Sequence, residues 1–206
     1  MSPVIFQIGP FALRWYGLMY ITAVLVGVWL VQKETDRKGF PITHDEIMNF
    51  AMVVMFAGIA GGRIYYVLFN WDFYGKFPVE IPQVWHGGLA IHGGLIGGGL
   101  AGWLYLRRRP IPFLQFADAV APAVVLGQAF GRFGNFMNGD AHGMPTTMAW
   151  GVVFPPVSIA GRQFTGIATH PVMLYELGLN LLWFLVLSRL RFMPHRQGFL
   201  FCLYFV

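Results

Sequence analysis

Long apolar runs are the feature that most constrains what this chain of 206 residues can fold into. A helix needs about 20 mostly apolar residues to cross the hydrocarbon core of a bilayer. Together these runs predict an all-α polytopic membrane protein, one membrane domain over residues 1–206, with about five complete transmembrane helices and the start of a sixth. The sixth run begins near Gly198 and stops at Val206, which predicts a C-terminally truncated chain. The five longer runs are Trp15–Val31, Asn49–Phe69, Gly87–Leu106, Phe113–Gly131 and Pro171–Leu187.

The composition agrees with a membrane protein. Hydrophobic residues make up 56% of the chain and charged residues only 11%, whereas soluble domains carry about 25% charged residues. The net charge of +5 does not indicate a nucleic-acid partner, because the basic residues lie in short clusters between apolar runs. The single cysteine, Cys202, excludes an intrachain disulfide framework.

The basic clusters also predict the orientation of the chain. Cytoplasmic loops of membrane proteins carry an excess of Lys and Arg. Clusters follow the first, third and fifth runs, whereas the connections after the second and fourth runs are poor in basic residues. We therefore expect the N-terminus outside the cell membrane and three cytoplasmic loops. The clusters are Lys33, Arg37 and Lys38, then Arg107, Arg108 and Arg109, then Arg189, Arg191 and Arg196.

In this orientation, polar side chains from several segments converge at the outer ends of the runs. Polar groups at a membrane boundary are unfavourable to place and usually functional. The segment Gly131–Gly143 contributes several of them among four glycines, and the connection 138–170 that it opens is predicted to be an external cap with a short strand near Val152. The sequence therefore predicts a site open to the outer leaflet. Its residues are Tyr16, Arg63, His92, Arg132, Asn135, Asn138, Asp140, His170 and Glu176.

The two arginines in this set have different alternatives. Arg132 can bind a lipid phosphate in a bidentate way. The non-functional alternative is a side chain that snorkels to the membrane interface. Arg63 is evenly balanced between ligand binding and a structural pair with Glu176 or Asp140. A buried carboxylate without a cation is destabilising, so we expect Glu176 or Asp140 to lie beside Arg63 or Arg132.

The glycine-rich segment His86–Gly99 places His92 in an apolar run. This histidine can be a general base, a group that orients a lipid headgroup, or a packed histidine on a helix face. Most of its neighbouring glycines are interpreted as helix-packing positions. Asp118, in the inner part of the fourth run, is interpreted as structural. No metal site is predicted, because His86 and His92 do not share a helical face.

These segments together resemble the prolipoprotein diacylglyceryl transferase family. The resemblance covers most of the chain and implies transfer of the diacylglyceryl group of phosphatidylglycerol to the lipobox cysteine thiol of a bacterial prolipoprotein. The implied product is a thioether, the leaving group is glycerol 1-phosphate, and no cofactor is implied. The implied location is the bacterial inner membrane. The motifs are Trp15–Tyr20, Gly61–Val67, His86–Gly99, Gly131–Gly139 and His170–Glu176.

The resemblance also implies roles for individual residues. His92 and Arg132 are the catalytic candidates, and the others are expected to bind substrate. Asp140 stands where the family usually has Glu. The family's essential arginine and glutamate of the final spans lie beyond Val206, so a chain ending there is not expected to suffice for activity. The substrate-binding candidates are Tyr16, Arg63, Asn135, Asn138, Asp140, His170, Tyr175 and Glu176.

Two other classes of protein stay open at this stage. A membrane transporter of a small anion or a lipid could use Arg63 and Arg132 as a binding site, although no inverted repeat of the second and third runs is evident. A non-enzymatic membrane scaffold would not need polar residues that converge at one depth. The expected partners are phosphatidylglycerol, the prolipoprotein lipobox and membrane lipid.

Overall fold

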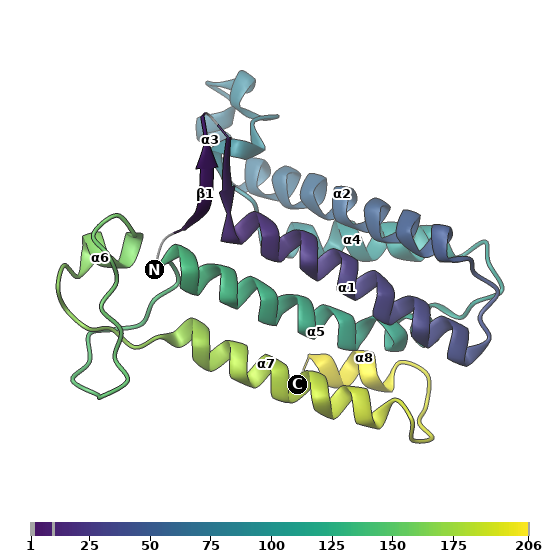
Figure 1. Ribbon diagram of the computed structural model, residues 1–206. Helices are drawn as coiled ribbons and strands as arrows, with labels where there is room; N and C mark the ends of the chain where they lie inside the picture. The colour runs from purple at the N-terminus through teal and green to yellow at the C-terminus, as the bar shows by residue number, and fades with distance from the viewer. Residues whose placement is uncertain (1–2, 10, 206) are drawn as a thin grey trace. The chain divides into compact units, whose positions relative to one another are not determined.

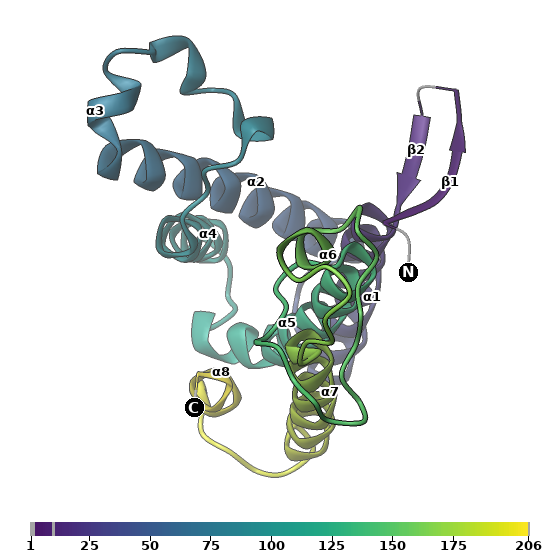
Figure 2. The same ribbon diagram turned by 90° about the vertical axis from the view of Figure 1, so that its left-hand side faces the viewer.

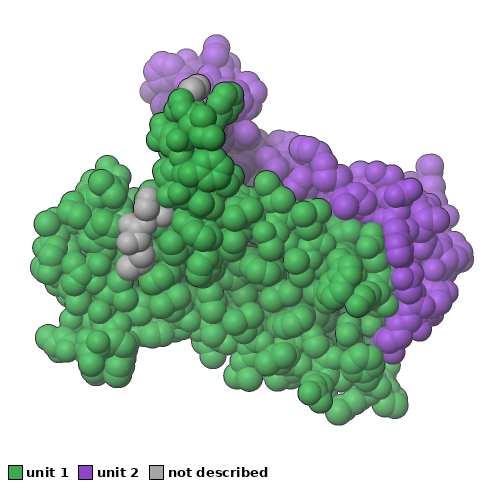
Figure 3. Space-filling view, in the orientation of Figure 1, with its two compact units in different colours: residues 1–34, 117–206 green, residues 35–116 purple. Residues whose placement is uncertain are grey.

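The computed structural model describes residues 3–9 and 11–205 and is mostly helical, which confirms the predicted fold class (Figure 1). The chain divides into two compact units, one of residues 1–34 and 117–206 and one of residues 35–116 (Figure 3). The helices are α1 (Trp15–Lys38), α2 (His44–Phe69), α3 (Trp71–Tyr74), η1 (Pro78–Glu80), η2 (Val84–His86), α4 (Ile91–Leu106), α5 (Phe113–Asn138), α6 (Ile159–Gln163), α7 (Val172–Leu190) and α8 (Phe199–Tyr204).

Four of the described helices, α1, α2, α5 and α7, are long and apolar enough to cross a membrane. The third predicted run gives the shorter helix α4, because Gly87 and Gly88 have positive φ angles of 87° and 76° and the helix begins only at Ile91. At 16 residues, α4 is about 24 Å long, less than the roughly 30 Å of a hydrocarbon core. The predicted count of five complete spans is therefore not confirmed.

A β-hairpin that the sequence analysis did not predict precedes α1. Strand β1 (Val4–Ile8) pairs in antiparallel fashion with β2 (Phe11–Arg14), so that Val4 lies opposite Arg14 and Ile8 opposite Phe11. The polar Gln7 and the turn residue Gly9, with φ of 58°, interrupt the apolar character of this segment. The hairpin leads directly into Trp15, the first residue of α1.

The larger unit is built on α1, α5 and α7, which lie side by side in two perpendicular views (Figures 1 and 2). Trp15 of α1 packs edge-on against Phe133 of α5, with ring centroids 5.8 Å apart. Val125 of α5 forms a buried cluster with Leu187 of α7 and Leu200 of α8. These contacts place the beginning of α1 and the end of α5 at the same end of the unit.

Asp118 fastens α8 to α5 inside this unit. Its side chain is almost fully buried and accepts hydrogen bonds from the backbone N–H groups of Gly198 (2.7 Å) and Phe201 (2.9 Å). The first helical N–H groups have no partner within their own helix, so a buried carboxylate satisfies them. Nδ1 of His195 lies 3.8 Å from Oδ2 of Asp118. The structural interpretation of Asp118 is confirmed.

The smaller unit is dominated by the packing of α2 on α4. A Cβ at Gly97 would lie 2.5 Å from the carbonyl oxygen of Ala57, and a Cβ at Gly61 or Gly93 would overlap backbone atoms of the opposite helix. Small residues let membrane helices approach this closely. The packing interpretation of these glycines is confirmed, because any side chain there would push the two helices apart.

The connection between α5 and α7 is folded rather than extended. Phe154, Ala160 and Met173 form a buried cluster, with Phe136 and Val152 against it. Val152 forms an isolated antiparallel bridge, with the two backbone bonds to Thr169 both 3.0 Å long. The predicted short strand near Val152 is therefore present as a bridge. The external placement of this cap, residues 138–170, stays a prediction.

Candidate functional site: a polar cavity between three helices

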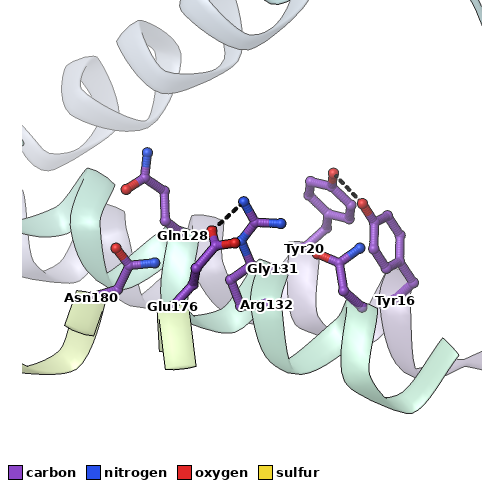
Figure 4. A pocket seen from close by; sticks show the side chains of 8 residues that line it. Tyr16, Tyr20, Gln128, Gly131, Arg132, Glu176 and Asn180 are labelled. Carbon is purple, nitrogen blue, oxygen red and sulfur yellow. Dashed lines mark hydrogen bonds and ion pairs between the residues drawn. The ribbon is translucent and has the colours of Figure 1, made fainter. Parts of the chain in front are cut away.

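A cavity of about 280 Å³ opens in the larger unit among α1, α5 and α7 (Figure 4). An aliphatic lining would be expected for helices of this hydropathy, but nearly every side chain at the cavity is polar. Tyr residues come from the first two turns of α1, an arginine and two amides from α5, and a carboxylate and an amide from α7. The lining residues are Tyr16, Tyr20, Gln128, Gly131, Arg132, Asn135, Glu176 and Asn180.

An ion pair lies at the centre of the cavity. Nη2 of Arg132 is 2.5 Å from Oε2 of Glu176, and the two side chains are 35% and 40% exposed. The prediction that a carboxylate would lie beside one of the two arginines is confirmed for this pair. The pair keeps an arginine inside a membrane-length helix, yet its exposure leaves part of the guanidinium open to a ligand.

Two tyrosines form the wall on the Arg132 side of the ion pair (Figure 4). The Tyr20 hydroxyl donates to the Tyr16 hydroxyl at 3.2 Å, and the rings meet edge to face with centroids 4.9 Å apart. Tyr16 lies directly against Gly134 of α5, where a Cβ would be 3.0 Å from its ring. Gly134 therefore lets Tyr16 reach the cavity, and the predicted site residue Tyr16 is brought beside Arg132.

The two asparagines of the motif hold its aspartate. Nδ2 of Asn135 donates to Oδ1 of Asp140, and Nδ2 of Asn138 donates to Oδ2, each at 2.7 Å. Gly139 makes this possible, because its φ of 67° turns the chain back at the end of α5. Both amides were predicted to bind substrate. In the structure their N–H groups donate to Asp140. The two asparagines therefore hold this carboxylate just beyond the C-terminal end of α5.

His170 and Tyr175 join the cap to the start of α7. Nδ1 of His170 is hydrogen bonded to the Tyr175 hydroxyl at 3.0 Å, and Nε1 of Trp150 donates to the same hydroxyl at 2.7 Å. Glu176 follows Tyr175 directly, so this small network sets the first turn of the helix that carries it. Neither His170 nor Tyr175 lines the cavity described above.

The two remaining candidates, Arg63 and His92, belong to the smaller unit. The Arg63 side chain donates to five backbone carbonyls, those of Glu80, Ile81, Gln83, Gly87 and Gly88, at 2.5–3.3 Å. Its partners are thus carbonyl groups of the loop before α4 and not the carboxylates that the sequence analysis named. A guanidinium has five N–H groups, and all five find acceptors here.

His92 lies in the first turn of α4, because the helix begins at Ile91. The residue is exposed, and its ring stacks on Tyr65 with centroids 5.9 Å apart. This contact restricts the orientation of the exposed ring. Both the catalytic and the orienting interpretation of His92 stay predictions.

Besides Gly131, three polar residues at the cavity were not predicted as site residues: Tyr20, Gln128 and Asn180. The signal for two of them is in the sequence. Asn180 is the only carboxamide or charged residue between Glu176 and Ser188, and Gln128 has the same place between Asp118 and Arg132. Within residues 3–9 and 11–205, no group of three or more His, Cys, Asp or Glu side chains could hold a metal ion.

Helices of membrane length that hold an arginine–glutamate pair in an open polar cavity define a polytopic membrane protein with a polar site between its helices. The sequence profile of prolipoprotein diacylglyceryl transferase matches residues 3–206. Proteins named phosphatidylglycerol–prolipoprotein diacylglyceryl transferase are 42% identical in Geobacillus kaustophilus, over 100% of this chain and 76% of the relative, and 40% identical in Fusobacterium nucleatum, over 91% and 76%. The chain belongs to the prolipoprotein diacylglyceryl transferase family.

Proposed function

We propose that this protein transfers the diacylglyceryl group of phosphatidylglycerol to the lipobox cysteine thiol of bacterial prolipoproteins. The observation that carries the proposal is the Arg132–Glu176 pair in a cavity of membrane-length helices, in a chain whose relatives bear the name of this activity. Family membership argues against the transporter alternative.

The reaction can be written with its atoms balanced. The cysteine thiolate attacks the carbon of the diacylated glycerol that carries the phosphate oxygen. A C–S bond forms, and the C–O bond breaks with its electron pair on oxygen. Glycerol 1-phosphate leaves, and the thiol proton goes to a base, since the thiolate is the nucleophile. The leaving group gains negative charge during this step, so a preorganised cation beside the phosphate lowers the barrier.

Arg132 is the residue that we assign to the phosphate. Its Nη2 faces Glu176, whereas its Nε and Nη1 donate no hydrogen bond to the described residues, and these N–H groups can bind two phosphate oxygens in parallel. Glu176 then orients the guanidinium from the other side. His92 is the candidate base or the candidate headgroup-orienting group. Tyr16 is assigned to the headgroup, and the remaining substrate-binding candidates, Arg63, Asn135, Asn138, Asp140, His170 and Tyr175, keep that assignment as predictions.

The protein is proposed to lie in the bacterial inner membrane with its N-terminus outside and its site facing the outer leaflet. Arg191, beyond the end of α7, pairs with Glu34 near the end of α1 at 3.5 Å. The cavity residues Tyr16 and Glu176 come from the opposite ends of the same two helices. Basic residues at one end and the cavity at the other fit the positive-inside pattern.

The test is a transfer assay with the full-length protein in membranes, phosphatidylglycerol and a synthetic lipobox peptide. We expect the peptide to gain the mass of one diacylglyceryl group and an equal amount of glycerol 1-phosphate to appear. A peptide with serine in place of the lipobox cysteine is the matched control and should stay unmodified. Release of glycerol 1-phosphate without modification of the cysteine peptide would contradict the proposal.

A further inference from the structure

Two carboxamides lie one helical turn deeper in the cavity than the ion pair. Asn180 follows Glu176 by four residues on α7, and Gln128 precedes Arg132 by four residues on α5. Because α5 runs opposite to α7, both offsets point away from the helix ends that carry the site. Each corresponds to about 6 Å along a helix axis. Figure 4 shows both amides beyond Glu176, with the tyrosines on the far side of Arg132.

The cavity therefore has an order along its length: tyrosine hydroxyls, then the ion pair, then the two amides. A glycerophospholipid has an order of its own along the membrane normal. Its headgroup lies outermost, its phosphate next, and its two ester carbonyls lie on the hydrocarbon side of the phosphate. In the proposed orientation, a phosphate held by Arg132 places the ester carbonyls at the depth of Asn180 and Gln128.

The chemistry of the two groups is complementary as well. An ester carbonyl only accepts hydrogen bonds, and a carboxamide NH₂ supplies two donors. Among the described residues, the Asn180 side chain has no hydrogen-bond partner in the protein. Gln128 donates to the Tyr204 hydroxyl at 2.7 Å, which holds its amide in place and leaves its second N–H. A half-buried carboxamide without a partner in a membrane-length helix is unfavourable, and its two donors are open to a ligand in the cavity.

We propose that Asn180, with Gln128 beside it, forms a subsite for the ester carbonyls of the lipid's diacylglyceryl group. The inference rests on the proposed function and orientation. It makes Asn180 a specificity-determining residue that selects diacyl lipids over lipids whose chains are joined by ethers.

The experiment compares two substrates in the transfer assay: phosphatidylglycerol with ester-linked chains and its diether analogue. The diether retains the headgroup, the phosphate and the reacting carbon and lacks only the carbonyls. For the unmodified protein we expect kcat/KM to be about fivefold higher for the diester, the effect of one hydrogen bond. The Asn180→Leu variant should lose this preference by losing activity on the diester alone.

The outcomes separate the two proposals. No transfer from either lipid by the unmodified protein contradicts the proposed function itself. Transfer from both lipids at equal kcat/KM, or a preference that survives in Asn180→Leu, overturns the ester subsite and leaves the proposed function standing. If Asn180→Leu does not accumulate in membranes, Gln128→Leu takes its place and should reduce the preference. Gln115→Leu, near the opposite end of α5, is the matched control and should keep it.

Discussion

Two arginines, each next to glycines in the sequence, have opposite surroundings in the structure. Arg63 is 5% exposed, and its five N–H groups all donate to backbone carbonyls between Glu80 and Gly88. Its guanidinium also lies over the Tyr74 ring, 5.0 Å from the centroid. Arg132 has one ion pair, and a third of its side chain is open to the cavity. All five N–H groups of Arg63 thus donate within the protein, whereas Arg132 has a single ion pair among the described residues.

The difference shows that an arginine in a helix of membrane length can use all of its donors to stabilise the fold, and that a neighbouring glycine does not mark it as a ligand-binding residue. The loop that precedes α4 contains the two positive-φ residues Gly87 and Gly88 and exposes carbonyl groups with no helical partner. One rigid fork of donors satisfies those carbonyls at once. The loop ends where α4 begins, at Ile91, directly before His92.

The largest expected effect concerns Arg132. Arg132→Ala should lower kcat by roughly 10²–10³, because a donor to the departing phosphate acts mainly in the transition state. Arg132→Lys should lower kcat as well, since an ammonium lacks the parallel fork. The transfer assay on full-length protein measures both variants. Arg108→Ala, at an exposed loop position, is the control and should retain activity. Near-wild-type turnover by Arg132→Ala would return this residue to the snorkelling alternative.

The next effect is on stability and concerns Arg63. Arg63→Met should lower the free energy of unfolding by about 3 kcal/mol, because several carbonyls lose charged donors together. Arg63→Lys should recover only part of this. Thermal unfolding in detergent, and labelling of a cysteine placed at Pro82, measure the loss of the loop's structure. A variant with unchanged stability and a kcat lowered as in Arg132→Ala would instead make Arg63 a substrate contact and erase the contrast between the two arginines.

Loosening the close packing of α2 on α4 should give a smaller effect on stability. Gly93→Ala should destabilise the protein by about 2 kcal/mol, because the new methyl group overlaps the backbone of α2 at Gly61. Gly99→Ala is the matched control on α4. A Cβ there meets nothing within 4 Å, and alanine is the better helix former, so stability should be unchanged or slightly higher. Equal melting temperatures for the two variants would contradict the close packing.

Much of this fold could be predicted from hydropathy and a few polar residues. Apolar length determined where α1, α2, α5 and α7 lie, and the need of a buried carboxylate for a cation predicted that a carboxylate would lie beside Arg63 or Arg132, as Glu176 does beside Arg132. Both are consequences of desolvation, which acts on composition and hardly depends on detailed geometry. The hairpin before α1 was missed because five- and four-residue strands carry a weak pattern next to a long apolar run.

The partners of individual polar groups could not be predicted in the same way. Asn135 and Asn138 were expected to face a ligand, but the turn at Gly139 brings Asp140 back onto both amides. A pair with Glu176 or Asp140 was one of the two alternatives for Arg63, but its acceptors are carbonyls from a loop whose path depends on two glycines. Asn180 and Gln128 were overlooked because they lie outside the glycine-rich segment that contains Asn135 and Asn138, although each stands alone in an apolar stretch.

The smallest effect concerns the link between the cap and the helix that carries Glu176. The Tyr175 hydroxyl bonds both Trp150 and His170, so Tyr175→Phe should lower the free energy of unfolding by about 1 kcal/mol. Trp150→Phe removes one of the two bonds and should cost less. In the double variant the two effects should fall short of their sum, because both act through the same hydroxyl. Thermal unfolding of the four proteins measures this coupling.

Because Arg132 and Glu176 stay in place in all of them, kcat should change by less than the roughly 10²–10³ expected for Arg132→Ala. Strict additivity would show that Trp150 does not hold the cap through Tyr175, and a loss of kcat as large as that of Arg132→Ala would bring His170 and Tyr175 into the substrate site.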